Sequence, residues 1–324
     1  MTAGKGLKIT YTDVVDSAYF DTNWSAAYDS LELANAQFVV PLPSQTISNV
    51  FSRGKVHVET MSNIVNAKER MLLIGALSGL EPDNLTGTSL AAAENIGVLE
   101  GIQGDDAEEV LAGNIEDLAD YSVSAAYGDS FRVVYMAPDQ IVRNIAGTNT
   151  FLPGYYMAAA LGGFLSGQTA IQEPPTFKNL TGFNILRDKV YRQITLDGLA
   201  DAGVLVVQPV AGGGKMLHGL TTTQSLAPEE EEISIVGIRD QIARVLRGSL
   251  RPFVGKVNSP TIISEISSGV EKILRSQISQ GLLTNIGAIS VQRNAVEPRQ
   301  IDISAEINPA GPINWIFIDV EVSL

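Results

Sequence analysis

The 324-residue sequence contains no cysteine and only two histidines. Without cysteine there are no disulfide bonds, thiolate nucleophiles or cysteine-ligated metals, and the redox environment stays undetermined. A catalytic triad would have to use His57 or His218, and no Gly-x-Ser-x-Gly motif presents a serine to either. A metal site built on both histidines and carboxylates lacks any supporting spacing. The sequence therefore gives little support to an enzyme, and we expect no metal.

Basic residues are also few. The chain has 22 lysines and arginines against 36 aspartates and glutamates, a formal net charge of −14. This balance argues against a broad surface for nucleic acid or acidic membranes. The longest nearly apolar stretch, residues 151–165, contains a proline and three glycines and falls short of a membrane span. We therefore expect no direct nucleic-acid binding, no membrane insertion and no secretory signal, since the first residues lack an apolar core.

One glycine-rich segment, Gly212-Gly213-Gly214-Lys215, invites comparison with a phosphate-binding loop. That loop needs a glycine where Pro209 stands, and a serine or threonine where Met216 stands. A flexible hairpin turn, with a strand at 216–223 after it, explains the segment better. We accordingly expect no cofactor.

The chain is 45% hydrophobic and 18% charged, as in globular proteins, and its length suggests about two domains. Short apolar runs typical of buried strands alternate with segments of helical period. We expect strands at 38–40, 71–75, 131–136, 180–185 and 204–207, and helices at 25–36, 45–70, 105–118, 151–165 and 190–201. This alternation predicts a mostly parallel α/β sheet. Pro174-Pro175 marks the expected end of the first domain.

The last third begins with the acidic run 229–232, interpreted as a solvated loop, and a possible strand at 233–236. A helix follows at 237–250, with Ile238, Ile242, Val245 and Leu246 inward and Arg239, Asp240, Arg244 and Arg247 outward. Ser259 and Pro260 are typical N-cap and first-turn residues of a second helix that stops at Gly281. Three strand-like runs, at 288–293, 300–307 and 313–322, are joined by connections short enough to predict antiparallel pairing.

The final run is densely patterned for a chain end. Ile316, Ile318, Val320 and Val322 would share one face of a strand, with Trp315, Phe317, Asp319 and Glu321 on the other. Such a strand needs a sheet, in its own domain or in a neighbour. Basic residues gather on the preceding helices, as a solvated face or as a strip that meets an acidic partner: Arg244, Arg247, Arg251, Lys256, Lys272 and Arg275.

Several segments together resemble the sheath protein of contractile phage tails and related injection systems. They are Pro174-Pro175, Leu180-Thr181-Gly182, Gly203-Val204-Leu205-Val206, Ile238-Arg239-Asp240-Gln241-Ile242, Leu250-Arg251-Pro252-Phe253-Val254-Gly255, Asn258-Ser259-Pro260 and Pro312-Ile313-Asn314-Trp315-Ile316-Phe317. The resemblance runs from about residue 164 to residue 324. The chain departs from it at the start, where the Pro-Gly-Val-Tyr-like opening and the longer N-terminal region of the family are absent.

The resemblance implies an α/β fold that becomes α+β in its C-terminal part. A mostly parallel α/β domain (25–172) would be followed by a sheath-core domain of packed helices and an antiparallel sheet (173–312). Residues 1–24 would form an N-terminal arm and residues 313–324 a C-terminal strand or arm.

The function implied is that of a non-enzymatic sheath subunit. Copies would polymerise into a helical sheath of stacked rings around an inner tube and contract to drive the tube through a target envelope. Its partners would be the tube protein, baseplate proteins and tail terminator proteins, and its place the virion tail, after assembly in the host cytoplasm.

In this family, terminal extensions add strands to the sheets of neighbouring subunits. The intersubunit strand would comprise Ile313, Trp315, Ile316, Phe317, Ile318, Val320 and Val322. The N-terminal arm would use Leu7, Ile9 and Tyr11, and Lys272 and Arg275 on the helix 260–280 would face the tube. The alternatives are another contractile-system component of sheath-like fold, such as a cap or baseplate part, and an α/β hydrolase or nucleotide-binding enzyme.

Overall fold

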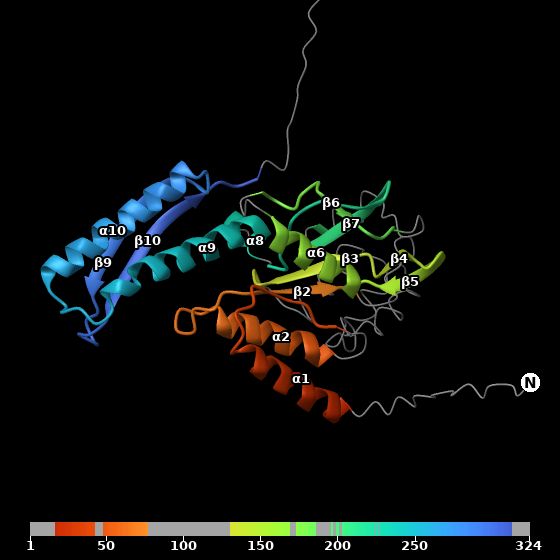
Figure 1. Cartoon of the computed structure of the whole chain (residues 1–324), viewed down its shortest axis with the longest axis horizontal. Helices are drawn as coiled ribbons and strands as arrows, with labels where there is room; N and C mark the ends of the chain where they lie inside the picture. The colour runs from red at the N-terminus through yellow and green to blue at the C-terminus, as the bar shows by residue number, and fades with distance from the viewer. Residues whose placement is uncertain are drawn as a thin grey trace, which may run out of the picture.

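The computed structural model describes residues 17–42, 48–76, 130–168, 173–185, 196, 199–200, 203–223, 225 and 227–312. They form two parts (Figure 1). The first part, which we call the body, is a six-stranded sheet with helices on both faces. The second, the C-terminal module, consists of the helices α9 and α10 and a two-stranded sheet, β9–β10, and projects away from the body.

The sheet of the body is mostly parallel, as predicted. Its strand order is β1-β2-β3-β7-β8-β6, and the first four strands run parallel, while β8 runs antiparallel to both of its neighbours, β7 and β6. The strands are β1 (Phe38–Val39), β2 (Met71–Gly75), β3 (Val133–Ala137), β6 (Asn179–Thr181), β7 (Val204–Val210) and β8 (Gly213–Met216). The sheet thus contains strands from both sides of residue 172. The domain boundary predicted at that residue stays a prediction.

Helices cover both faces of this sheet. Neighbouring strand residues point to opposite faces, so Leu72 and Leu73 of β2 mark the two sides. On the side of Leu72 lies α2 (Ser48–Met61), whose Gly54 lies against the Leu72 side chain, and α1 (Ser17–Leu31) packs on α2. On the side of Leu73 lies α6 (Tyr155–Gly167), whose Gly162 contacts Leu73.

The ends of the first two helices differ from the prediction. The first helix begins at Ser17 and not at residue 25, and the second ends at Met61 and not at residue 70.

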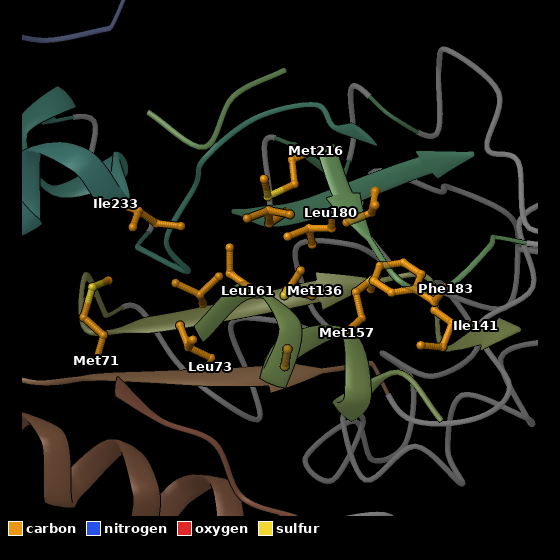
Figure 2. Close-up of a cluster of buried hydrophobic side chains, with 14 of the residues drawn as sticks. Met71, Leu73, Met136, Ile141, Met157, Leu161, Leu180, Phe183, Met216 and Ile233 are labelled. Carbon is orange, nitrogen blue, oxygen red and sulfur yellow. The ribbon is translucent and has the colours of Figure 1, made fainter. Parts of the chain in front are cut away.

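The core between the sheet and α6 is apolar (Figure 2). Leu73, Met136 and Met157 are among its fully buried side chains, and each contributes about 1.5–3 kcal/mol relative to exposure. Met216 of β8 and Ile233 of α9 close the cluster from the C-terminal side. One core therefore unites β2 and β3 with segments that follow residue 173.

The segment before α6 differs from the prediction. A hairpin of β4 (Gln140–Ile145) and β5 (Thr148–Pro153) precedes the helix, which begins at Tyr155 instead of residue 151. A Cβ at Gly75 would stand 2.2 Å from the backbone of Gly154, so the end of β2 touches the start of α6.

The glycine-rich segment is a strand as well as a turn. The chain turns at 211–212, and Gly213 to Met216 then pair with β7. The strand after the turn therefore lies at 213–216, and the prediction that placed it at 216–223 is wrong. A Cβ at Gly213 would stand 2.1 Å from the carbonyl oxygen of Leu180, which explains a glycine there. The acidic run forms α8 (Pro228–Glu231) instead of a loop, and Glu232 is buried.

The C-terminal module follows the predicted order of elements. It contains α9 (Ile233–Leu250), the 3₁₀ turn η2 (Arg251–Phe253), α10 (Pro260–Ser279), β9 (Leu283–Arg293) and β10 (Ile301–Pro309). The Ser259 side chain accepts a hydrogen bond from the backbone N–H of Ile262 and so caps the start of α10, as predicted. Gly281, just after its end, has a φ of +77°, which confirms the predicted end of the helix. The antiparallel pairing of β9 with β10 is confirmed too. The strand predicted at 233–236 is wrong, because α9 already begins at Ile233.

The helix α9 joins the two parts. Ile233 and Val236 in its first turn belong to the core of the body. Ile238 and Ile242, one and two turns further, belong to a second apolar cluster with α10 and the β9–β10 sheet. Within the described ranges, no helix is both long and apolar enough to cross a membrane.

Candidate assembly surface

The module presents one polar helix face and one small sheet. On α10, Ile266, Val270 and Leu274 are buried against the second core. Lys272 lies two residues from both Val270 and Leu274, about 200° around the helix, and therefore points to solvent. Arg275 is also exposed. The structure thus places both residues of the predicted tube-facing pair on the outer side of α10.

The outer face of α10 is mixed in charge. Arg275 pairs with Glu271 across 2.7 Å, and both side chains are at least half exposed. Such a pair contributes about 0.3–0.5 kcal/mol. Glu265 is exposed on the same helix, and Lys272 makes no ion pair with any described residue. Lys272 is therefore the cation on this helix that is most available to an acidic partner.

The wider basic strip expected from the sequence does not form as one surface. Arg244 and Arg247 of α9 turn toward the body, where both meet the carboxylate of Glu69, which precedes β2. Burial alone would raise the pKa of Glu69, but the hydrogen bond from Arg247 and the charges of both arginines hold that pKa below its ordinary value.

Asp240 was predicted to face outward, and this was wrong. It is 4% exposed, and its carboxylate accepts a hydrogen bond from the buried guanidinium of Arg132, at the start of β3. Arg132 and Arg239 both stack on the ring of Phe131, at 5.0 and 4.2 Å from its centroid. The partner of Asp240 is 108 residues away in the sequence, so no local pattern could have revealed it.

The β9–β10 sheet pairs only with itself in the part of the chain that the structure describes. Its residues Ile286, Val291, Ile301 and Ile307 pack on the second core, while no described strand pairs with either of its outer edges. An isolated pair of strands is marginal in water, and open edges readily accept another strand. The arrangement therefore offers two edges where an extended segment could add.

A shallow hollow of about 310 Å³ lies between α1 and α2, with Tyr28, Asp29, Glu32 and His57 in its lining. His57 is buried, and its Nε2 lies 2.9 Å from Nη1 of Arg70, which donates to it. Burial and the charge of Arg70 lower the pKa of His57, so the ring is neutral near pH 7. Arg70 also donates to the carbonyls of Leu31 and Ala34. The pair of His57 and Arg70 therefore links α2 to the end of α1.

The two other residues considered for a chemical role, Lys215 and His218, both lie near the ring of Phe177. Lys215 lies in β8 with its Nζ 4.5 Å from the ring centroid of Phe177. The ring of His218 is 6.4 Å from that of Phe177. Among the described residues, no three acidic or histidine side chains gather as a metal site would need.

The predicted strand residues Ile313, Trp315, Ile316, Phe317, Ile318, Val320 and Val322 lie outside the described residues, as do Leu7, Ile9 and Tyr11. The helix predicted at 105–118 lies outside them too, and of the helix at 190–201 residues 196, 199 and 200 are described and helical.

No family model and no curated protein matches the sequence. Solved structures, in contrast, match nearly the whole chain. The helical sheath of the anti-feeding prophage (AFP) in its contracted state has a TM-score of 0.63 and 14% identity, over 97% of this chain and 76% of that one. The sheath tail protein of Desulfitobacterium hafniense has a TM-score of 0.62 and 13% identity, over 100% of this chain and 66% of that one.

The chain has the fold of contractile sheath proteins. A chain of the AFP baseplate matches as well, with a TM-score of 0.62 and 14% identity over 97% of this chain and 75% of that one. The chain spans 66% to 76% of the lengths of these three chains. The predicted fold class, and the sheath resemblance as a likeness of fold, are confirmed.

Proposed function

We propose that this chain is the structural subunit of a contractile sheath, which polymerises helically around an inner tube and contracts to drive that tube through a target envelope. The observation that supports this most is the sheath fold itself, shared over 97% of the chain with a contracted helical sheath. That match is long enough to include both the body and the module, so the proposal does not rest on one common domain.

The proposed role is mechanical, not enzymatic. The buried imidazole of His57 accepts a hydrogen bond from Arg70, and the carboxylates of Asp240 and Glu69 pair with arginines. The partners would be further copies of the chain, the tube protein, and the baseplate and terminator proteins at the ends. The assembly would be a virion tail or a related injection particle.

The link between copies would be a strand added to the open β9–β10 sheet. The alternating pattern of residues 313–322 fits a strand with one apolar face. Each added backbone hydrogen bond contributes about 0.5–1.5 kcal/mol net, so a strand of this length supplies a few kcal/mol before apolar burial. Leu7, Ile9 and Tyr11 could pair along the opposite edge in the same way. Such strands keep copies joined while the subunit bodies move.

The tube contact would lie on the exposed face of α10, through Lys272 and Arg275. Glu271 already neutralises part of the charge of Arg275, so Lys272 would make the larger contribution to electrostatic attraction of the tube. Charges at the rim of an interface set orientation and encounter rate more than affinity. This suits a contact that must release during contraction.

Deletion of residues 317–324 tests the proposed link. The variant should keep the described fold, because β9 and β10 pair without those residues. We expect it to form no extended or contracted sheaths by electron microscopy, while its circular dichroism and its thermal unfolding match those of the full chain. Normal sheaths from the deleted chain would contradict the strand proposal.

The nearest alternative is a cap or baseplate part, which the similarity to an AFP baseplate chain keeps open. Copy number separates the two, because a sheath subunit is present many times per particle and a cap or baseplate part in a ring. Quantitative mass spectrometry of purified particles, with the tube protein as reference, measures it. A ratio near one chain per tube subunit supports the sheath. Nucleotide binding by the monomer would favour the remaining alternative, an α/β hydrolase or nucleotide-binding enzyme.

A further inference from the structure

The helix α9 has two working faces. Ile238, Ile242 and Leu246 pack on the second core. Asp240 and Arg244 follow Ile238 and Ile242 by two residues each, about 200° around the helix, and so point the opposite way. Arg247 continues this second face one turn on. The second face is turned toward the edge of the body's sheet, where strands β2 and β3 begin.

Five charged side chains meet at that edge. Asp240 binds Arg132, and both side chains are 5% exposed. Arg247 donates to the carboxylate of Glu69, and Arg244 donates to the Glu69 carbonyl oxygen over 3.1 Å. Arg244 also lies 4.0 Å from Asp240, which connects the two pairs. We call these five residues, Arg132, Asp240, Glu69, Arg244 and Arg247, the ionic clamp.

In the part of the chain that the structure describes, α9 makes the main contacts between the module and the body. The helix α10 and the strands β9 and β10 pack on one another and on α9. The body's elements pack among themselves, and α9 is the element that passes from one core to the other. At 18 residues α9 is about 27 Å long, so a small rotation at its base becomes a large displacement at its far end.

Apolar contacts at the base of α9 hold the helix without fixing its angle sharply, since the hydrophobic effect is non-directional. Hydrogen-bonded ion pairs depend on geometry, and removing one partner of a buried pair is strongly destabilising even where the pair contributes little to net stability. We propose that the ionic clamp sets the direction of the C-terminal module relative to the body, and that opening the clamp lets the module swing as a unit about the first turns of α9. The inference concerns the single chain and does not require the sheath role.

The absence of cysteine allows a direct test in the full-length chain. Cysteines introduced at Ala27 on α1 and Ser268 on α10, both exposed, can carry spin labels on the body and the module. Labelled chains diluted into an excess of unlabelled ones report distances within one chain by double electron–electron resonance. The parent protein should give one narrow distance distribution.

Three clamp variants are compared with that parent. They are Glu69→Gln, the pair Arg244→Ala and Arg247→Ala, and the pair Arg132→Met and Asp240→Leu, which replaces the buried ion pair by apolar side chains and so protects folding. The control is Glu271→Gln with Arg275→Gln, an exposed ion pair on α10 away from the clamp. We expect the clamp variants to widen the distribution about twofold or to add a second peak, and the control to match the parent.

Two results would overturn the proposal. If clamp variants with a parental circular dichroism spectrum keep the narrow distribution, the apolar contacts of α9 alone set the direction of the module. If every clamp variant unfolds the body and the module together in a single transition, the ion pairs are required for folding, and the clamp cannot open in the folded chain. Neither result bears on sheath assembly, which is scored by microscopy.

Discussion

At the scale of single residues, Arg132 and Asp240 show that a charged side chain can be buried when its ion-pair partner is buried beside it. Both are charged, and both are nearly inaccessible. Removing one partner of such a pair typically costs about 3–5 kcal/mol, because the other charge stays buried and uncompensated. The Nε of Arg132 is also buried without a hydrogen-bond partner among the described residues, so the native fold already contains one unsatisfied donor at this pair. Side chains that look solvated on a helical wheel can therefore be the most constrained in the fold.

Two other residues predict how the fold responds to acid. The pKa of His57 is lowered, so protonation below about pH 6.5 favours the unfolded chain. The pKa of Glu69 is also lowered, so its ion pairs stabilise fully above the ordinary value of about 4.5 and lose this effect as the pH falls through its lower folded pKa. Stability should therefore decline in two steps, first through His57 and then through Glu69.

The first step can be isolated with His57→Gln. A glutamine oxygen can accept the hydrogen bond from Arg70 but does not titrate. The thermal midpoint of this variant should stay flat from about pH 8 to about pH 5, while that of the parent falls. Lys55→Gln on the same helix serves as a control that keeps His57. Parallel curves for parent and His57→Gln would contradict the assignment of this step to the imidazole.

At the scale of elements, the sequence predicted best where the signal is local. Ser259, Pro260 and Gly281 set the ends of α10 as their cap chemistry requires. The start of α9 was missed because Ile233 and Val236 are both buried, which gives the same apolar run as a strand. The β4–β5 hairpin has no such run, since β5 is largely exposed, and was missed for that reason.

The helix α10 also permits a prediction about the tube. Lys272→Glu should impair assembly on tubes and leave tube-free polymerisation intact, because Lys272 is exposed and makes no ion pair among the described residues. Arg275→Glu should add to the defect, since it also loses the pair with Glu271. Cosedimentation with assembled tubes measures the effect.

Arg299→Glu is the matched control for Lys272→Glu. It makes the same charge change at a site that is 89% exposed, in the same module but off α10. Equal loss of tube binding in both variants would mean that net charge, and not the face of α10, governs the contact. Unchanged assembly of Lys272→Glu would count against the tube-facing assignment.

At the scale of the whole molecule, the alternation of buried strands with helices was enough to predict a mostly parallel sheet. It was not enough to show how far the sheet extends, because β7 and β8 join it from beyond residue 173 through pairings distant in sequence. The likeness to sheath proteins is likewise carried by the arrangement of elements, at 13–14% identity. Packing geometry persists at an identity where side chains have largely changed.

The most direct measurement is a cryo-electron microscopy helical reconstruction of the protein assembled around its tube. The account predicts a helical lattice in which residues 313–322 of one copy extend the β9–β10 sheet of the next, with α10 facing the tube. Closed rings confined to one end of the tube, or a lattice in which both edges of β9–β10 stay unpaired, would contradict it.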